Sequence, residues 1–181
     1  MRTIRIKLYK FNELSEDAQQ KALETLYDIN VDTDWWEFIY EDAKEIGLTI
    51  TGFDMDHFCN GEFNLSGESV AHAIFENHCK DCETYKTAQS FMNDYNQAFK
   101  DYPTEEDEDG YDTNEYDRDE AITEAETDFR QSLLEDYRIM LRNEYEYKTG
   151  KEAIIETIEA NEYEFTKDGK LANNCYRIKS N

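Results

Sequence analysis

The spacing of apolar residues predicts one helix that is longer than any other in the chain, from about Asp117 to Lys148. At about 100° per residue, one side of this helix collects apolar positions and the opposite side collects acidic ones. The apolar stripe consists of Ile122, Ala125, Phe129, Leu133, Tyr137 and Met140. The opposite row, here called the acidic ladder, consists of Asp117, Glu120, Glu124, Asp128 and Glu135. The pattern indicates a helix that buries one face and turns a line of carboxylates to solvent.

The rest of the pattern mixes strand and helix signals. Residues 3–9 alternate between apolar and polar side chains, which is typical of a strand with one buried face. Residues 48–58 and 62–66 predict two strands joined by a turn at Asn60-Gly61, with Gly52 as a bulge. A second hairpin turn is predicted at residues 167–169. Further helices are expected over residues 15–29, 34–46, 68–78, 85–102 and 151–161.

We therefore expect a single α+β domain over residues 1–181, with a small, mostly antiparallel sheet packed against five or six helices. The helix at 34–46 carries apolar side chains around more than half of its girth, so it is expected to be the most buried helix. The acidic segment 104–116 is expected to be a mobile loop within the domain.

The net charge of the chain limits the kinds of molecule that it can bind. The chain has 43 Asp and Glu against 19 Lys and Arg, a formal net charge of −24. Residues 101–162 hold 22 acidic and 6 basic side chains, which is about two thirds of that net charge. Because such a surface repels a phosphate backbone, we expect no direct binding of nucleic acid. A protein with a basic groove is the natural partner.

The candidate partner-binding residues are the carboxylates of the acidic loop and of the acidic ladder. The loop contributes Glu105, Glu106, Asp107, Glu108, Asp109 and Asp112. Four tyrosines interleave with acidic residues along the chain, namely Tyr111, Tyr116, Tyr145 and Tyr147. They are either anchors of an interface or ordinary solvent-facing residues. The plain alternative for the ladder itself is a solvated face in an acidic protein.

The cysteines and histidines suggest a metal site less strongly. Cys79 and Cys82 have the spacing of a zinc ligand pair, and Cys59 and His78 stand nearby in the sequence. A second pair, His57 with Cys59, lacks a familiar zinc spacing. Ordinary packing of free cysteine is the favoured interpretation, and redox use of the CxxC motif is a further alternative. We expect no metal and no cofactor.

The sequence contains little evidence for a catalytic site. A calcium loop centred on Gly110 fails because Tyr116 stands where a bidentate Glu is needed. The chain has no nucleophile elbow, phosphate loop or HExxH motif, so we expect a binding protein and not an enzyme. No signal-peptide pattern and no apolar run of about 20 residues is present, which predicts a cytoplasmic protein.

Three segments carry a resemblance to known proteins: KLYKFNELSEDAQQKALE (7–24), DWWEFIYEDAKEIGLTI (34–50) and ANEYEFTKDGKL (160–171). They resemble a family of small phage and prophage proteins described as antitoxin-like. The segment HFCNGEF (57–63) departs from the glycine-rich hairpin of that family. The resemblance implies a phage or mobile-element origin and brings no catalytic residues.

These observations favour a phage-encoded acidic inhibitor that occupies the basic, nucleic-acid-binding groove of a host defence or DNA-handling protein. DNA-mimicking inhibitors of restriction and CRISPR enzymes share this character. The second hypothesis is an antitoxin or regulatory protein that binds a specific toxin by shape. The third is a zinc-stabilised binding module.

Overall fold

The computed structural model describes residues 6–172 and confirms the α+β class. Within these residues, six α-helices and one short 3₁₀ helix accompany a two-stranded antiparallel sheet. In chain order the elements are η1 (Phe11–Glu13), α1 (Glu16–Thr25), α2 (Glu37–Glu45), β1 (Leu48–Asp54), β2 (Phe58–Phe63), α3 (Gly67–Asn77), α4 (Glu83–Asp101), α5 (Glu115–Lys148) and α6 (Lys151–Ala160).

The chain divides into two compact units. Unit 1 joins the residues up to Trp35 with those from Asn143 onward, and unit 2 runs from Trp36 to Arg142. The sequence pattern contained no linker signal at either boundary, and the expectation of a single domain stays a prediction. Each unit is described by itself.

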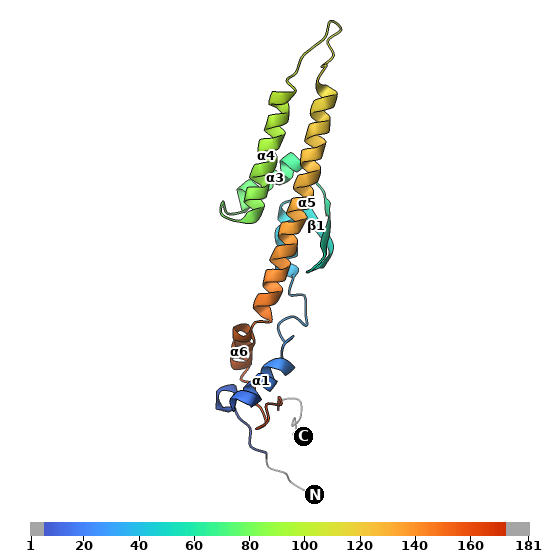
Figure 1. The fold of residues 1–181 in the computed structure, drawn as a ribbon. Coiled ribbons are helices and arrows are strands. Elements are labelled where there is room, and N and C mark those ends of the chain that lie inside the picture. The colour runs from blue at the N-terminus through green and yellow to red at the C-terminus, as the bar shows by residue number, and fades with distance from the viewer. Residues whose placement is uncertain (1–5, 173–181) are drawn as a thin grey trace, which may run out of the picture. The chain divides into compact units, whose positions relative to one another are not determined.

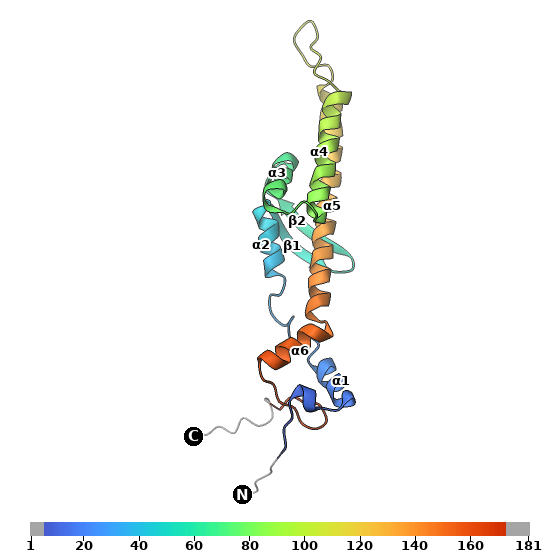
Figure 2. The same ribbon diagram turned by 90° about the vertical axis from the view of Figure 1, so that its left-hand side faces the viewer.

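Helix α5 runs through unit 2, and α4 lies alongside it (Figures 1 and 2). The rings of Phe91 on α4 and Phe129 on α5 stack with centroids 4.5 Å apart and planes 12° apart. Such an offset-stacked pair adds about 0.5–1.5 kcal/mol to the free energy gained by burying the rings. Pro103 follows the end of α4, as its missing N–H and fixed φ require.

The apolar stripe on α5 drifts around the helix. Phe129, Leu133 and Tyr137 are buried as predicted, but Met140 is half exposed and Leu141 is buried in its place. Residues four apart advance by about 40° beyond a full turn, so a row spaced by fours winds slowly around the cylinder. The stripe therefore faces α4 near Phe129 and faces α2 near Tyr137, whose hydroxyl donates to Asp42 Oδ2 at 2.8 Å.

The hairpin of β1 and β2 turns at a different place from the predicted one. Residues Asn60 and Gly61 lie inside β2, paired with Gly52 and Ile50, and the turn is at residues 55–57. The Asp54 carboxylate accepts from the backbone N–H groups of Asp56 at 2.9 Å and His57 at 3.0 Å. These hydrogen bonds from the backbone to the Asp54 side chain favour a turn at residues 55–57 over the turn predicted from Asn60-Gly61. The predicted irregularity at Gly52 is confirmed.

Helix α2 is not the most buried helix, contrary to the sequence prediction. It begins at Glu37, after the two tryptophans, and its buried residues are Ile39 and Ala43. Phe38 keeps 77% of its surface exposed. The buried residues of α2 face β1, and Asp42 reaches Tyr137 of α5, whereas the side that carries Phe38 remains in solvent despite the apolar content of the helix. Gly47, at φ 83°, follows the helix as predicted.

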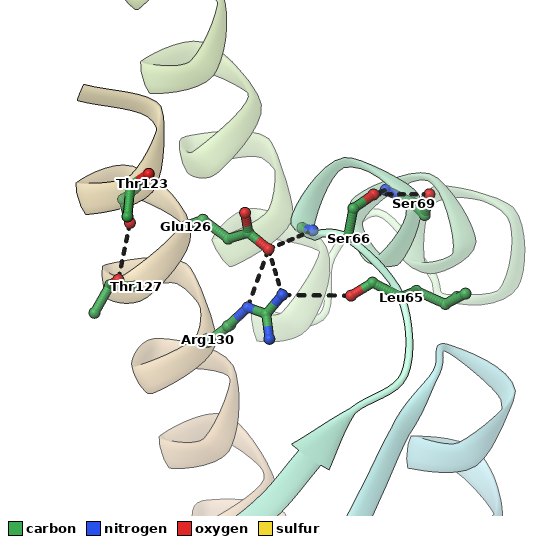
Figure 3. Close-up of polar contacts among 8 residues, drawn as sticks. Leu65, Ser66, Ser69, Thr123, Glu126, Thr127 and Arg130 are labelled. Carbon is green, nitrogen blue, oxygen red and sulfur yellow. Dashed lines mark hydrogen bonds and ion pairs between the residues drawn. The ribbon is translucent and has the colours of Figure 1, made fainter. Parts of the chain in front are cut away.

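Helix α3 is held against α5 by one carboxylate and one guanidinium (Figure 3). Glu126 Oε1 accepts from the backbone N–H of Gly67, the first residue of α3, at 2.8 Å, and also pairs with Arg130. Arg130 donates to the carbonyl of Leu65 at 3.4 Å. The negative charge lies at the helix N-terminus, where the helix dipole favours it. A Cβ on Gly67 would lie 2.8 Å from Glu126 Cγ, so this approach requires glycine.

Unit 1 is built around Phe165, which is fully buried. Its backbone pairs with Tyr9 on one side and with Leu171 on the other. Of the strand predicted at residues 3–9, only residues 6–9 are described, and Tyr9 alone pairs there. The core around Phe165 comes from α1, η1 and α6, with Ala18, Ala22, Leu23, Phe11, Ile154 and Ile158. The predicted turn at 167–169 is present, with Gly169 at φ 82°.

Gly169→Ala is expected to destabilise unit 1 strongly, because a Cβ there would lie 2.2 Å from the carbonyl oxygen of Ala18. The left-handed φ adds about 1–2 kcal/mol for any L-residue. Gly110→Ala is the matched control, since Gly110 has φ 83° and open space around its Cβ position. Chemical denaturation should show a much larger loss for Gly169→Ala. Equal losses would mean that the approach to Ala18 does not matter.

Glu126→Gln is expected to lower the free energy of unfolding by about 1–2 kcal/mol, because it weakens charge-assisted hydrogen bonds to Gly67 and Arg130. Glu124→Gln, two residues away on the exposed face, removes the same charge and should leave stability within about 0.5 kcal/mol. Thermal and chemical denaturation of the two variants measure the difference. A similar loss in both would contradict the role given to Glu126.

Candidate interaction surface

The predicted partner-binding carboxylates all belong to unit 2, and most of them are exposed. In the loop, Glu105, Glu106, Asp107, Glu108 and Asp109 are exposed, while Asp112 is half-buried. In the ladder, all five carboxylates are exposed. The structure thus brings a contiguous stretch of chain and one helix face to solvent, as the sequence predicted, but its carboxylates differ in what they contact.

Two carboxylates organise the acidic loop. Asp107 Oδ1 accepts from the backbone N–H groups of Asp109 and Tyr111, each at 2.9 Å. Asp112 Oδ1 accepts from the N–H groups of Glu105 at 3.2 Å and Asn114 at 3.1 Å. Short acidic side chains commonly close turns in this way. These hydrogen bonds hold the backbone of the loop as an ordered turn. Asp107 and Asp112 therefore stabilise the loop itself.

Asp112 also joins the loop to α5. Its Oδ2 accepts from Arg118 Nη2 at 2.5 Å, and Arg118 Nη1 donates to the carbonyl of Tyr102 at 3.1 Å. Arg118 is buried and its guanidinium lies 5.4 Å from the centroid of Phe99. Arg118 continues the buried stripe of α5 toward the N-terminus of the helix, and the Asp112 carboxylate of the loop neutralises its charge. The hydrogen bond from Arg118 holds the pKa of Asp112 below its ordinary value of 3.8.

The ladder carboxylates fall into two groups. Asp117, Glu120, Glu124 and Asp128 make no ion pair within the described part of the chain. Glu135 instead receives two hydrogen bonds from Arg138, at 2.6 and 2.7 Å, and this contact lowers the pKa of Glu135. Arg138 also donates to the carbonyl of Met55 in the hairpin turn. The unpaired part of the ladder therefore ends at Asp128.

One carboxylate from a neighbouring helix, which the periodicity of α5 could not reveal, enlarges the acidic surface. Asp94 of α4 lines the same hollow of about 340 Å³ as Asp128. Glu115 and Asp119, in the first turns of α5, are also exposed, but at about 100° per residue they lie on the side opposite the ladder. The tertiary pairing of α4 with α5 was needed to place Asp94.

The four tyrosines have different surroundings. Tyr111 and Tyr116, in and next to the loop, expose 72% and 76% of their surface. Tyr147 exposes 66%, while Tyr145 is half-buried with its ring 5.6 Å from that of Trp35. Tyr111 and Tyr116 are therefore available as contact residues beside the carboxylates, and Tyr145 has an internal role.

Cys175 lies outside the described residues, and the other cysteines and the histidines do not form a candidate metal site. Within residues 6–172, no group of three or more His, Cys, Asp or Glu side chains is placed to hold a metal ion. Cys59 is buried in β2, where burial and then Glu135 raise its pKa to about 11. His57 is exposed and its Nδ1 contacts Asp54 at 2.7 Å in the hairpin turn. Cys79 and Cys82 flank a turn before α4.

Comparison with protein-family models, with curated proteins and with solved structures finds no match to this chain. The resemblance of residues 7–24, 34–50 and 160–171 to antitoxin-like phage proteins stays a prediction. Over residues 6–172, none of the helices combines the length and the apolar content that crossing a membrane requires.

Asp112→Asn is expected to loosen the loop, because an amide cannot form the ion pair with Arg118. Amide hydrogen exchange over residues 105–114 should accelerate, whereas Glu108→Gln, at an exposed position, should change nothing. In the unmodified chain, a carboxyl with a depressed pKa stabilises the fold fully above its ordinary value of 3.8. That contribution is lost as pH falls through the depressed value. Unchanged exchange in Asp112→Asn would contradict this role.

Proposed function

We propose that this chain is an acidic binding protein that occupies the basic, nucleic-acid-binding groove of a host protein. Its origin would be a phage or other mobile element, and its setting the cytoplasm of a bacterial host. The observation that carries the proposal is the row Asp117, Glu120, Glu124 and Asp128, four exposed carboxylates without ion pairs on one face of a rigid helix.

The spacing of this row suits a groove that binds phosphates. Successive ladder positions rise by about 4.5–6 Å along the helix axis. One strand of B-DNA presents a phosphate about every 3.4 Å of axis, so the row carries roughly two thirds of that linear charge density. The loop acids and Asp94 add charge beside it. A basic groove would therefore meet a sparser but preorganised line of negative charge.

The helix that carries the row is held in place on its other side. Phe129, Leu133, Tyr137 and Leu141 are buried, and Glu126 and Arg130 join α5 to α3. Because the carboxylates are fixed before binding, a partner does not have to order them, which reduces the entropic cost of association. Like charges three and four residues apart destabilise a helix by a few tenths of a kcal/mol per pair. The packing of α5 offsets that repulsion.

A second candidate is an antitoxin or regulatory protein that binds a specific toxin by shape. The observation in its favour is the pair of exposed aromatic rings, Tyr111 and Tyr116, since tyrosine is enriched among residues that dominate interface energetics. In this case the rings would supply most of the affinity and the carboxylates would mainly orient the encounter. Substituting either set separately distinguishes the two candidates.

The test begins with a pull-down from bacterial lysate at low and at high salt. The proposed groove binder should recover basic nucleic-acid-binding proteins at low salt and lose them steeply as salt rises. Nucleic acid added in excess should displace the bound protein, because both occupy the same groove. Recovery that is insensitive to both salt and nucleic acid would favour the shape-read toxin partner.

With a partner in hand, neutralising Glu120, Glu124 and Asp128 to Gln, Gln and Asn should slow association by about tenfold at low salt and weaken its salt dependence. The fold should be unchanged, since these side chains are exposed. The matched control neutralises Glu152, Glu156 and Glu159 on the exposed face of α6, an equal change of charge elsewhere. Stopped-flow or surface-based kinetics measure both variants. Equal effects would show that net charge, and not the ladder, guides the encounter.

A further inference from the structure

Residues 79–82 form a tight turn between α3 and α4. The backbone N–H of Cys82 donates to the carbonyl of Cys79 at 3.2 Å, and residues 80 and 81 form the corners of the turn. In such a turn the Cα atoms of the first and fourth residues lie within about 7 Å, the range in which a disulfide can close. The Cys82 thiol already points back over the turn, since its Sγ lies 2.8 Å from the Cys79 carbonyl oxygen.

The two thiols differ in their surroundings. Cys79 is exposed, while Cys82 is partly buried at the N-cap of α4, a helix of 19 residues. The exposed Cys79 thiol can meet a small molecule, while the Cys82 thiol is held against the start of α4. Lys86, one turn further along α4, is paired with Glu83 at 2.7 Å.

A chain of polar contacts runs from Cys82 into the interior of unit 2. Cys82 Sγ lies 3.2 Å from the hydroxyl of Thr84, and that hydroxyl lies 2.8 Å from His78 Nδ1. Thr84 is buried, and the His78 side chain exposes only 7% of its surface. The other ring nitrogen, Nε2, has no hydrogen-bond partner and lies 3.7 Å from Asp42 Oδ2. The imidazole therefore holds Nδ1 against the Thr84 hydroxyl and Nε2 toward a carboxylate, an arrangement in which Nδ1 can accept a proton from the hydroxyl.

We propose that Cys79 and Cys82 form a reversible dithiol–disulfide site that exchanges with disulfides of the glutathione type, with Thr84 and His78 as its proton relay. This inference is independent of the acidic surface, because none of the ladder or loop carboxylates contributes to it.

The exchange proceeds in two displacements. The Cys79 thiolate, which is exposed, attacks one sulfur of the small-molecule disulfide, whose S–S bond breaks and releases one thiolate. Cys82 then passes its proton through Thr84 to His78 Nδ1, and the Cys82 thiolate attacks Cys79 Sγ. The mixed S–S bond breaks, the second small-molecule thiolate leaves, and His78 returns its proton to solvent. Two protein thiols are oxidised, and one disulfide is reduced to two thiols.

The carboxylate of Asp42 on α2 faces His78 and favours this proton transfer. Cys82 is linked to His78 through Thr84, and Asp136 and Cys82 lie near Tyr137 of α5, which binds Asp42. Tyr137 donates to Asp42, so the carboxylate that faces His78 is held in place. Burial raises the pKa of Asp136, and burial and then Asp42 raise the pKa of Tyr137.

The test equilibrates the full chain in glutathione buffers of increasing oxidised fraction, traps the free thiols by alkylation and measures intact mass. The expected result is the loss of two alkylatable thiols in one transition, with no glutathione retained. Cleavage after Lys80 places Cys79 and Cys82 on separate peptides, which should stay joined until a reductant is added. If both cysteines remain alkylatable in fully oxidised buffer, or each carries its own glutathione, the proposal is wrong.

Three variants assign the roles. Cys82→Ser should accumulate one glutathione on Cys79, because the mixed disulfide cannot be resolved, and Cys59→Ser should behave as the original chain. Thr84→Val keeps the volume and removes the hydroxyl, so resolution of the mixed disulfide should slow by about tenfold or more at neutral pH. The same rate and pH profile in Thr84→Val would remove Thr84 and His78 from the mechanism. Circular dichroism verifies that each variant is folded.

Discussion

The arrangement of unit 2 depends on one continuous buried stripe along α5. Phe129 meets α4, Tyr137 reaches Asp42 of α2, and Leu134 lies close to Gly61 of the sheet. Because the stripe winds around the helix, Phe129 and Tyr137 face different neighbours, while Leu134, beside the stripe and only partly buried, faces the sheet. The face left over is the acidic one, so the apolar pattern of α5 decides which carboxylates meet solvent.

An excess of acid does not mean that every acid is a surface charge. Asp107 and Asp112 hold the loop backbone, Glu126 holds the N-terminus of α3, and Asp42 receives the Tyr137 hydroxyl. These carboxylates are stabilised by hydrogen bonds that replace water. The remaining exposed ones keep their hydration and their mutual repulsion. A chain of net charge −24 thus combines a few structural carboxylates with many that are available to a partner.

Much of the fold was predictable because it depends on local chemistry. Periodicity predicted the fold class and the buried stripe on α5 from Phe129 to Tyr137, although Ile122 and Ala125 of the predicted stripe are only half-buried. Glycine and proline predicted the ends of α2 and α4, before Gly47 and Pro103. The hairpin turn was misplaced because the Asp54 side chain supplied hydrogen bonds that a dipeptide signal does not anticipate. The exposure of α2 depends on how many neighbours surround it, which is a tertiary property.

The candidate surface was predictable in outline and not in detail. Exposed carboxylates repeat at helical spacing, so the line from Asp117 to Asp128 could be found from the sequence. Which acids pair with arginine depends on where Arg118 and Arg138 are held, and each of these guanidiniums also binds a carbonyl outside its own helix. The link between Cys82, Thr84 and His78 requires the turn that follows α3, and sequence spacing alone could not supply it.

The acidic loop has a consequence for proteolysis. No lysine or arginine occurs between Lys100 and Arg118, and Arg118 is buried. Trypsin therefore has no accessible site within the loop however exposed its backbone is, whereas a glutamate-directed protease meets Glu105, Glu106 and Glu108 there. A bound molecule that covers the loop would shield it from the second enzyme and leave the tryptic pattern of this segment unaltered. Comparing the digestions of one sample by the two proteases therefore shows whether a bound molecule covers the loop.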